Sequence, residues 1–444
     1  MKNTSKNKNP IDFSPASGSE AIQARRGHLG FLFFFGNSPD LAKIEAERVA
    51  ARLLPFLKYD SMITRQVAWF KSTELEKREK RDKGDKREEE LKTKLNVLSN
   101  VQNVLGGTVK IAEIIGSVRS LNYLENELMQ NLSQTSKHKI NLAISNYSSG
   151  KVYVKSTLIN LKNRLKTKNI SCRFVLAKEA DILSTAEIFH NKLDIWPNVE
   201  FNIVPMDGEF LIARTISVQN LNDWSKRDFG IPAPDAQSGM LPPKLARMML
   251  NLRNRETIYD PFCGNGRVLL EAAYLGLDFI GSDIDQVKVE STKKNLRWLR
   301  DQYQLKITNE EIEKRIFVAD AKTWNIESGI LNIDTTFDIR HSRFQIVTEP
   351  DLGPALHYLP RISQAETIAS NLLDLYFKSI NNLITKTTSG VFVIPAWKTQ
   401  EGHIIRLSDK ILDKLNDSRY HLNKLGEYAR PNSFIIREIY QINN

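Results

Sequence analysis

The segment Tyr259–Gly266, which reads Tyr-Asp-Pro-Phe-Cys-Gly-Asn-Gly, constrains the fold of this chain more than any other stretch. A carboxylate stands directly before a turn with two glycines, and Val268–Tyr274 follows with the character of a helix. A strand that ends in an acidic residue and bends through glycines into a helix is typical of a nucleotide-type α/β unit. The segment therefore predicts a parallel sheet with a ligand pocket at the carboxyl end of one strand.

The charge of Asp260 restricts what this pocket can bind. Gly264 and Gly266 let the backbone approach a ligand closely, and the N-terminus of the next helix usually favours an anion. A pyrophosphate on this loop would nevertheless meet the negative charge of Asp260, whereas the ammonium and sulfonium groups of S-adenosylmethionine would be attracted to it. We therefore expect S-adenosylmethionine as the cofactor, rather than NAD or ATP.

Two further carboxylates follow predicted strands. Leu277–Gly281 is expected to form a strand that delivers Asp283 about twenty residues after the first glycine, where an acidic side chain can hold ribose hydroxyls. Another strand, Arg315–Ala319, ends in Asp320, which we expect to meet the adenine amine. One Asp at a strand end is often only a turn former. Three at successive strand ends indicate one binding site.

Length and cysteine content bound the rest of the chain. A chain of 444 residues is too long for one ordinary core, so we expect two or three domains. No apolar run approaches the roughly 18 residues that span a bilayer, and the polar start Met1–Pro10 does not look like a secretory signal. Cys172 and Cys263 have no metal or disulfide spacing, which favours the cytoplasm. For Cys263, a small loop residue is a simpler interpretation than a nucleophile.

The charge of the chain points to a polyanionic partner. A net charge of +11 and a pI near 9.3 make nucleic acid the default partner, without choosing between RNA and DNA. Between Lys71 and Lys94 the chain is almost wholly charged. This composition favours a solvated helix or mobile insertion, and an arm that touches RNA is the alternative.

The pattern of apolar residues divides the chain in two. After a predicted tail at residues 1–27, a strand at His28–Phe35 and a helix capped by Ser38 open an α+β region. Its further elements are predicted as helices at Val152–Leu165 and Ser184–Asn191 and strands at Ile140–Ile144, Cys172–Val175, Glu200–Val204 and Phe210–Thr215, the last two forming a hairpin.

The stretch Asn222–Pro243, rich in Asp, Pro and Gly, is predicted to be a linker. Beyond it, strands and helices alternate as a parallel sheet requires. After the strands already described, we expect a strand at Phe344–Thr348, a helix at Ala365–Leu383, a strand at Gly390–Ala396, and a closing pair at His421–Ala429 and Phe434–Ile442 with its turn at Pro431 and Asn432.

Three segments give the chain a family resemblance: Lys226–Pro232, Gly239–Arg247 and the loop Asp260–Gly266. With them the chain resembles the THUMP-domain RNA guanine-N2 methyltransferases, which modify guanosine ten of tRNA. The resemblance covers Ile170–Asn444 and, more faintly, the region from His28. It implies a ferredoxin-like domain at 28–130 with the charged insertion 71–94, an RNA-binding THUMP domain at 131–218, a linker at 219–237 and a Rossmann-like methyltransferase domain at 238–444.

The resemblance also assigns roles within the pocket. Asp260, Gly264 and Gly266 would hold the methionine part of the donor, Asp283 its ribose and Asp320 its adenine. The remaining residues expected at the cofactor are Met240, Pro242, Lys244, Pro261, Ile284 and Ala321. For Pro242, Pro243 and Lys244 an ordinary helix start without a ligand is the alternative.

An exocyclic amine is a poor nucleophile, so hydrogen-bond acceptors must hold its nitrogen in line with the methyl group. Related amine methyltransferases carry Asp/Asn-Pro-Pro-aromatic after the fourth strand, and the ring stacks on an extruded base. Here Thr348–Pro354 reads Thr-Glu-Pro-Asp-Leu-Gly-Pro. Glu349 and the carbonyl of Pro350 are the expected catalytic acceptors.

The same loop departs from the pattern at two positions. Asp351 replaces the second proline and Leu352 the stacking ring. Stacking is worth about 1–3 kcal/mol per base, so its loss would weaken base capture roughly ten- to a hundredfold, unless His357 or Tyr358 supplies a ring. Arg267, where a small hydroxyl residue is more common, could pair with the donor's carboxylate or face solvent.

The favoured hypothesis is an S-adenosylmethionine-dependent tRNA methyltransferase that transfers a methyl group to the N2 amine of guanosine, without a metal or a covalent intermediate. One alternative is an RNA-binding protein of methyltransferase ancestry that catalyses poorly, motivated by Asp351 and Leu352. Another is a methyltransferase that acts on another RNA or on a DNA amine. We expect tRNA as the partner, no membrane, and a monomer or weak dimer. The need for a small activator protein and the number of methyl groups added stay open.

Overall fold

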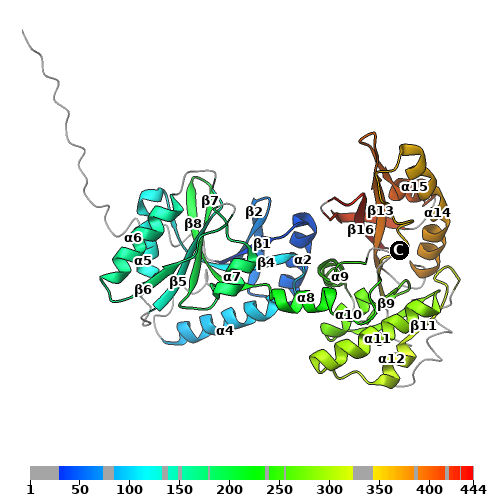
Figure 1. Ribbon diagram of the computed structural model, residues 1–444, viewed down its shortest axis with the longest axis horizontal. Coiled ribbons are helices and arrows are strands. Elements are labelled where there is room, and N and C mark those ends of the chain that lie inside the picture. Colours follow the sequence, from blue (N-terminus) through cyan, green and yellow to red (C-terminus); the bar gives the residue numbers. More distant parts are fainter. Residues whose placement is uncertain are drawn as a thin grey trace, which may run out of the picture.

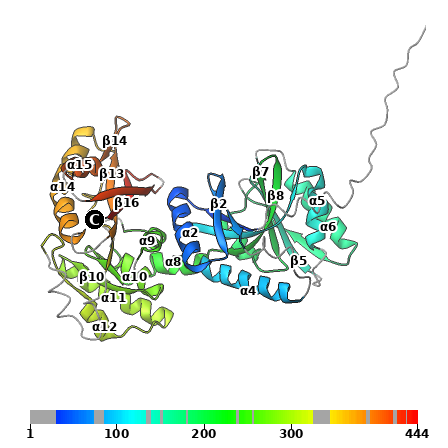
Figure 2. The same ribbon diagram turned by 180° about the vertical axis from the view of Figure 1, so that it is seen from behind.

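The computed structural model describes residues 30–73, 85–132, 139–148, 153–178, 181–235, 240–254, 257–323, 344–384, 389–415, 420–430 and 432–443. The predicted tail, residues 74–84 of the charged segment and Pro431 of the predicted turn therefore lie outside the described residues. Two sheets with their helices lie side by side along the long axis of the molecule, and the helix α8 (Leu221–Phe229) lies between them (Figures 1 and 2).

The N-terminal sheet has the strand order β2-β3-β1-β4-β8-β7-β5-β6. Its strands are β1 (Gly30–Phe35), β2 (Leu57–Thr64), β3 (Val67–Ser72), β4 (Thr108–Val118), β5 (Lys139–Asn146), β6 (Ser171–Phe174), β7 (Val199–Met206) and β8 (Glu209–Val218). The accompanying helices are α2 (Pro39–Leu53), α4 (Asp85–Gln102), the short η1 (Leu121–Tyr123), α5 (Leu124–Leu132), α6 (Val154–Lys166) and α7 (Thr185–Asn191). The elements predicted in this half are present, with ends shifted by up to three residues, and β7 and β8 form the predicted hairpin.

This sheet runs through both regions that we predict as separate N-terminal domains. Strand β4 from the first region pairs antiparallel with β8 from the second, with Lys110 opposite Val218 and Val118 opposite Phe210. The hairpin β2–β3 extends the same sheet at its other edge and was missing from the sequence-based prediction. The division into ferredoxin-like and THUMP domains stays a prediction.

The C-terminal sheet has the order β11-β10-β9-β12-β13-β16-β15, and β14 pairs with β13. The strands are β9 (Thr257–Asp260), β10 (Asp278–Asp283), β11 (Ile316–Val318), β12 (Gln345–Thr348), β13 (Ser389–Lys398), β14 (Ile404–Arg406), β15 (His421–Tyr428) and β16 (Ile435–Asn443). The strands β11, β10, β9, β12 and β13 are all parallel to one another, whereas β16 is antiparallel to both of its neighbours, β13 and β15. This confirms the predicted Rossmann-like α/β fold with a closing antiparallel pair.

Helices cover both faces of this sheet because successive strand residues are all apolar. Ile258 and Val347 pack in a core with α9 (Pro243–Asn251), α10 (Arg267–Tyr274) and α11 (Gln286–Tyr303). Their neighbours Tyr259 and Ile346 pack on the opposite side with α14 (Ile362–Ile384) and α15 (Leu407–Leu415). A short helix, α12 (Asn309–Arg315), precedes β11. Strands buried on both faces are what a doubly wound sheet requires.

Two local predictions were wrong. Within the stretch predicted as a linker, residues 221–229 form α8. The side chain of Asn220 caps this helix by accepting a hydrogen bond from the N–H of Asp223. The helix also buries the side chains of Trp224 and Arg227. The Asp and Gly content of the stretch concealed this helix. Ser38 precedes α2 as predicted, but its side chain caps no backbone N–H, and α2 starts at Pro39.

A buried polar network joins the two halves. Glu45 on α2 accepts hydrogen bonds from the N–H groups of Gly106 (2.7 Å) and Gly107 (2.8 Å) and from Asn251 Nδ2 on α9 (2.6 Å). Arg247 on α9 donates to the carbonyl of Asn103 and to Glu271 on α10. Because buried polar groups are costly unless they keep their partners, this network fixes the orientation of the two sheets.

Among the described residues, the helices lack the length and apolar character needed to cross a membrane.

Candidate active site

A cavity of about 420 Å³ opens where β9, β10 and β12 end. These strands are neighbours in the sheet, so the carboxylates that follow or end them, Asp260, Asp283 and Glu349, meet at one edge. All three line the cavity. The other predicted site residues that line it are Met240, Gly264, Ile284 and Pro350.

Asp260 is the most buried of these carboxylates, with 2% of its surface exposed. It accepts hydrogen bonds from Thr348 Oγ1 (2.6 Å) and from the N–H of Phe262 (3.2 Å), both at Oδ1. Burial raises its pKa to about 7, and the charges of Asp283 and Glu349 act in the same direction. Burial thus disfavours the ionised form of Asp260, and a cation bound in the cavity would stabilise that form.

The glycine loop is shaped around Asp283. Gly264 and Gly266 have positive φ angles, +52° and +85°, which favour glycine. The N–H of Gly264 donates to Asp283 Oδ2 (2.9 Å), and the N–H of Asp285 donates to Oδ1 (3.0 Å). The carboxylate thus anchors the loop as well as lining the cavity. Cys263 is buried and its pKa is raised well above the usual value by burial, so its thiol is a poor nucleophile.

Arg267 lines the cavity and does not face the solvent. Its side chain is 6% exposed, and its guanidinium donates to the carbonyls of Arg227 (2.6 Å) and Asp228 (2.8 Å) at the end of α8. The solvent-facing alternative was therefore wrong. The sequence does not predict this contact between Arg267 and the end of α8, because its composition predicts a linker there and not a helix.

Glu349 has a partner that sequence reasoning also missed. Arg437 on β16 donates from Nε to Glu349 Oε1 at 2.6 Å. The Arg437 side chain is buried, with 6% exposed, and that of Glu349 is largely buried, with 13% exposed. Burial raises the pKa of Glu349, while the cations Arg437 and Arg430 counteract that rise. No local motif links residues 88 positions apart, so only the pairing of β13 with β16 brings them together.

The rest of this loop is held by packing. The carbonyl of Asp351 accepts a hydrogen bond from Tyr376 Oη (2.9 Å), and Asp351 Oδ1 accepts one from the N–H of Gly353 (2.9 Å). Leu352, where relatives of this chemistry carry a ring, lines the cavity but is 9% exposed and belongs to the core. Tyr358 is 61% exposed and is not part of the cavity wall.

The remaining predicted cofactor residues lie elsewhere. Asp320 accepts a hydrogen bond from the N–H of Lys322 (2.9 Å) and is outside the cavity lining, as are Pro261, Gly266 and Ala321. Pro242 and Lys244 line a separate groove beside the cavity. The cavity lining therefore includes Asp260, Asp283 and Glu349 but not Asp320, and the roles of these residues stay predictions.

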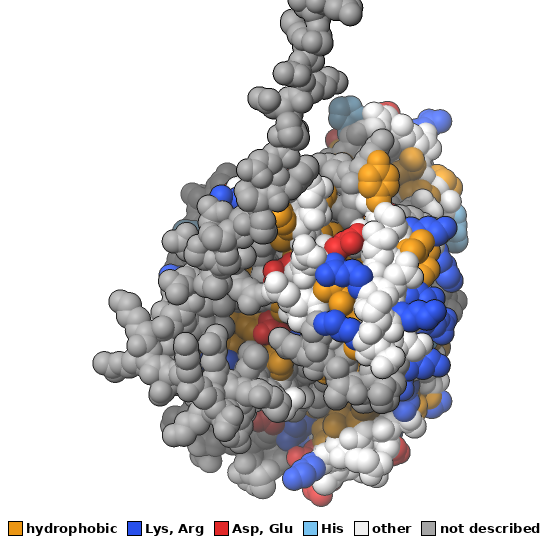
Figure 3. Space-filling view, turned by 90° about the vertical axis from the view of Figure 1, so that its left-hand side faces the viewer, with side chains coloured by type: hydrophobic (Ala, Val, Ile, Leu, Met, Phe, Trp, Pro, Cys, Tyr) orange, Lys and Arg blue, Asp and Glu red, His pale blue; other side chains and the backbone are white. Residues whose placement is uncertain are grey.

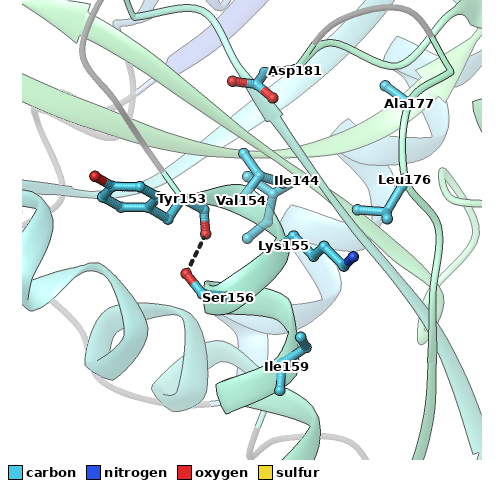
Figure 4. A pocket seen from close by; sticks show the side chains of 9 residues that line it. All are labelled: Ile144, Tyr153, Val154, Lys155, Ser156, Ile159, Leu176, Ala177 and Asp181. Carbon is cyan, nitrogen blue, oxygen red and sulfur yellow. Dashed lines mark hydrogen bonds between the residues drawn. The ribbon is translucent and has the colours of Figure 1, made fainter.

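The far end of the N-terminal sheet carries a basic surface. Lys155, Lys162, Arg164, Lys166 and Lys168, on α6 and the turn after it, are all exposed, and Figure 3 shows Lys and Arg side chains gathered at this end of the molecule. Beside them lies a cavity of about 560 Å³, lined by Tyr153, Lys155, Ile159 and Leu176 among others (Figure 4). Tyr153 is 71% exposed. Its backbone carbonyl accepts a hydrogen bond from Ser156 Oγ.

Comparison with known proteins shows similarity to methyltransferases over part of the chain. Residues 233–336 match the RMKL-like methyltransferase domain. The tRNA (guanine(10)-N2)-dimethyltransferase of Methanothermobacter thermautotrophicus is 36% identical over 102 residues, 21% of this chain and 29% of the relative. The corresponding enzyme of Methanocaldococcus jannaschii is 28% identical over 165 residues, 35% of this chain and 41% of the relative. The chain thus spans less than half the length of these relatives.

The fold has a match over almost the whole chain. The crystal structure of TrmN from Thermus thermophilus aligns with 94% of this chain and 100% of its own length, with a TM-score of 0.50 and 12% sequence identity. At that identity the match concerns the fold alone. Residues 233–336 therefore lie in an RMKL-like methyltransferase domain, and the chain is related in sequence to the tRNA guanine-N2 methyltransferases.

Proposed function

We propose that this protein is an S-adenosylmethionine-dependent methyltransferase that modifies the N2 amine of a guanosine in tRNA. The observation that carries the proposal is the shared cavity, in which Asp260 and Asp283 face the Glu349–Pro350 loop. The names of the sequence relatives, which specify guanine 10, favour that position of tRNA.

The cavity fits the donor by charge and by surface. Asp260 and Asp283 bring negative charge, while Leu241, Phe262 and Val268 give the wall an apolar part. When bound, S-adenosylmethionine would supply an electrophilic methyl group on a sulfonium. Asp260 would be held ionised by that positive charge, and Asp283 would accept hydrogen bonds from ribose hydroxyls with the lone pairs that its loop contacts leave unused. Ile284, 67% exposed at the rim, offers an apolar contact for the base.

The opposite wall would orient the acceptor amine. Glu349 can accept one amine hydrogen and the carbonyl of Pro350 the other, which holds the nitrogen lone pair toward the donor. Arg437 donates its hydrogen bond to Oε1 of Glu349. We therefore assign the other oxygen, Oε2, to the amine. The positive charge of Arg437 favours the ionised carboxylate that this role requires.

The N-terminal half would supply the grip on RNA. The five exposed cations on and after α6 form a positively charged surface suited to phosphates. We assign residues 131–218 to RNA binding and 238–444 to catalysis. Cys172 and Cys263 are buried and free of disulfides, which suits the cytoplasm.

The test uses purified protein, S-adenosylmethionine and unmodified tRNA transcripts with either G or A at position 10. Mass spectrometry of the digested nucleosides would detect N2-methylguanosine and distinguish one methyl group from two. Adding a cell extract would reveal any required activator protein, and light scattering would give the oligomeric state. If the protein makes no more methylated guanosine than Glu349→Ala, the proposed activity is wrong.

A second candidate is an RNA-binding protein with poor catalysis. The burial of Leu352 favours it, because the loop then offers no ring from that position for an extruded base. Tight binding of both S-adenosylmethionine and tRNA, with no turnover on either transcript, would support this candidate over the first.

A further inference from the structure

A second groove, of about 420 Å³, lies between the two halves of the molecule. Its walls come from the turn before α2, the residues before β4, the end of α8 and the start of α9. Pro242 and Lys244, which the sequence predicts at the cofactor, line this groove and not the donor cavity. Its two ends differ in chemistry, one being suited to an anion and the other to an aromatic ring.

The polar end is formed by Ser38 and Lys244. Ser38 directly precedes α2, is 9% exposed, and its hydroxyl caps no backbone N–H of that helix. A hydroxyl of this kind can donate a hydrogen bond to a phosphate oxygen.

Lys244 adds a positive charge to this end. Its Nζ donates to Gln219 Oε1 (2.6 Å), and an ammonium has two further hydrogens to offer. Burial lowers the pKa of Lys244, so an anion beside it would relieve an unfavourable position. Asp228 also lines the groove, but Arg267 lies 3.8 Å from its carboxylate and offsets its charge.

The apolar end is formed by Phe229, the last residue of α8. Its side chain is 81% exposed, the largest exposed fraction among the large hydrophobic residues of the described chain. Tyr428, at the end of β15, lines the same groove. An exposed ring beside an anion-binding end is the combination with which proteins bind single-stranded nucleic acid without reading its sequence.

The groove and the donor cavity share a wall. Met240 and Leu241 line the cavity, whereas Pro242, Pro243 and Lys244 continue directly into the groove. Arg430 donates to the carbonyl of Met240 (3.1 Å) and so fastens this wall to the end of the C-terminal sheet. A strand of RNA in the groove would therefore have its next nucleotide at the cavity.

We propose that this groove binds one RNA nucleotide next to the one being methylated, with its phosphate at Ser38 and Lys244 and its base stacked on Phe229. The inference rests on the proposed function, which it deepens. It also gives the RNA a stacking surface outside the loop in which Leu352 stands in place of a ring.

The test measures binding of an unmodified tRNA transcript by filter binding, without donor, over a range of salt concentrations. Phe229→Ala should raise Kd about tenfold, since stacking on one ring is lost, and Phe229→Trp should bind like the wild type. Lys244→Met should lower the slope of log K against log salt by about one phosphate contact. Leu412→Ala and Lys314→Met, which alter exposed residues on α15 and α12, are the matched controls.

The outcomes separate this inference from the proposed function. If Phe229→Ala binds within twofold of the wild type and Lys244→Met keeps the salt slope, the groove is not an RNA site. Ser38→Asp, which would repel a phosphate, gives a second reading should Lys244→Met lower the melting temperature. If the variants behave as expected but the wild type methylates no transcript, the groove stands and the proposed function fails.

Discussion

The two walls of the active-site cavity are built in different ways. The donor wall, Asp260–Gly266 with Asp283, is held mainly by hydrogen bonds between carboxylates and the backbone of its own loops, such as Gly264 N–H to Asp283. Thr348 on β12, which donates to Asp260, is its support from another element. The acceptor wall, Glu349–Gly353, depends on side chains from distant elements, with Arg437 on β16 and Tyr376 on α14 as its supports. One wall is mostly local in sequence, and the other is assembled by the tertiary fold.

This difference affects how closely each wall matches the sequence motif of the family that the chain resembles. Residues on the donor wall follow the pattern closely, because each backbone contact needs the neighbouring residue type and its glycine conformation. On the acceptor wall, a change such as Glu349 can be accommodated by a partner elsewhere, here Arg437. A pattern read along the sequence therefore predicts the donor wall better than the acceptor wall.

Asp260→Asn would test the donor wall with the largest expected effect. The substitution removes the buried charge that we assign to the sulfonium while keeping the size of the side chain, so methyl transfer should fall about a hundredfold or more. Asp301→Asn is the control, since Asp301 is exposed on α11 and lies outside the cavity lining, and we expect less than about a fivefold loss. Steady-state kinetics with tRNA and the donor measure both. Equal losses in the two variants would contradict the placement of the donor.

Arg437→Met would test the acceptor wall through stability. It leaves Glu349 buried without its ion-pair partner, which should lower the free energy of unfolding by about 3 kcal/mol. Denaturant unfolding measures this change. Arg406→Met is the control, because its partner Glu438 keeps Lys424 and Ser408, and about 1 kcal/mol or less is expected.

The double variant Glu349→Gln with Arg437→Met completes the comparison. It removes the unpaired carboxylate, so it should recover part of the stability lost in Arg437→Met. A double variant no more stable than the single one would mean that Arg437 stabilises β16 by packing and not through Glu349.

The pH dependence of stability probes the donor wall with a smaller effect. The folded pKa of Asp260 is about 7, above its ordinary value of 3.8, so the folded state is favoured while the group stays protonated. This stability is fully present below about pH 4 and is lost as the pH rises through 7, by about 2 kcal/mol between pH 5 and pH 7. Denaturant unfolding of the donor-free protein at these two pH values should show the loss. Asp260→Asn should lack this contribution, and an unchanged slope in that variant would assign it to other groups.

The same local rule explains how much of the fold the sequence predicted. Parallel strands such as Ile258–Asp260 and Ile346–Thr348 are apolar on both faces and end in polar residues, so their existence could be predicted. The hairpin β2–β3 could not, because Lys58, Asp60 and Arg65 hide its alternation. Helix α8 was missed for a similar reason, since its stability comes from burying Trp224 and Arg227 against other elements.

The site divides along the same line. Asp260, Gly264 and Asp283 meet as expected because each ends or follows a strand next to its neighbour in the sheet. Asp320 was expected to join them. Strand β11, which precedes it, is short and lies at the edge of the sheet, and the carboxylate of Asp320 accepts a hydrogen bond from the N–H of Lys322. Arg437 and Tyr376 carried no signal, because an Arg on a strand and a Tyr on a helix are ordinary until the tertiary fold sets them against the loop.

Tyr376→Phe would test the acceptor wall with the smallest expected effect. The hydroxyl donates to the carbonyl of Asp351, and its ring is fully buried, so the substitution removes one hydrogen bond without opening a cavity. We expect a loss of about 1 kcal/mol in the free energy of unfolding. If the loop is positioned by the fold, kcat should fall severalfold while KM for the donor stays unchanged, because the donor wall makes none of these contacts. A rise in KM for the donor with unchanged kcat would mean that the two walls are coupled, and the distinction between a local and an assembled wall would then fail.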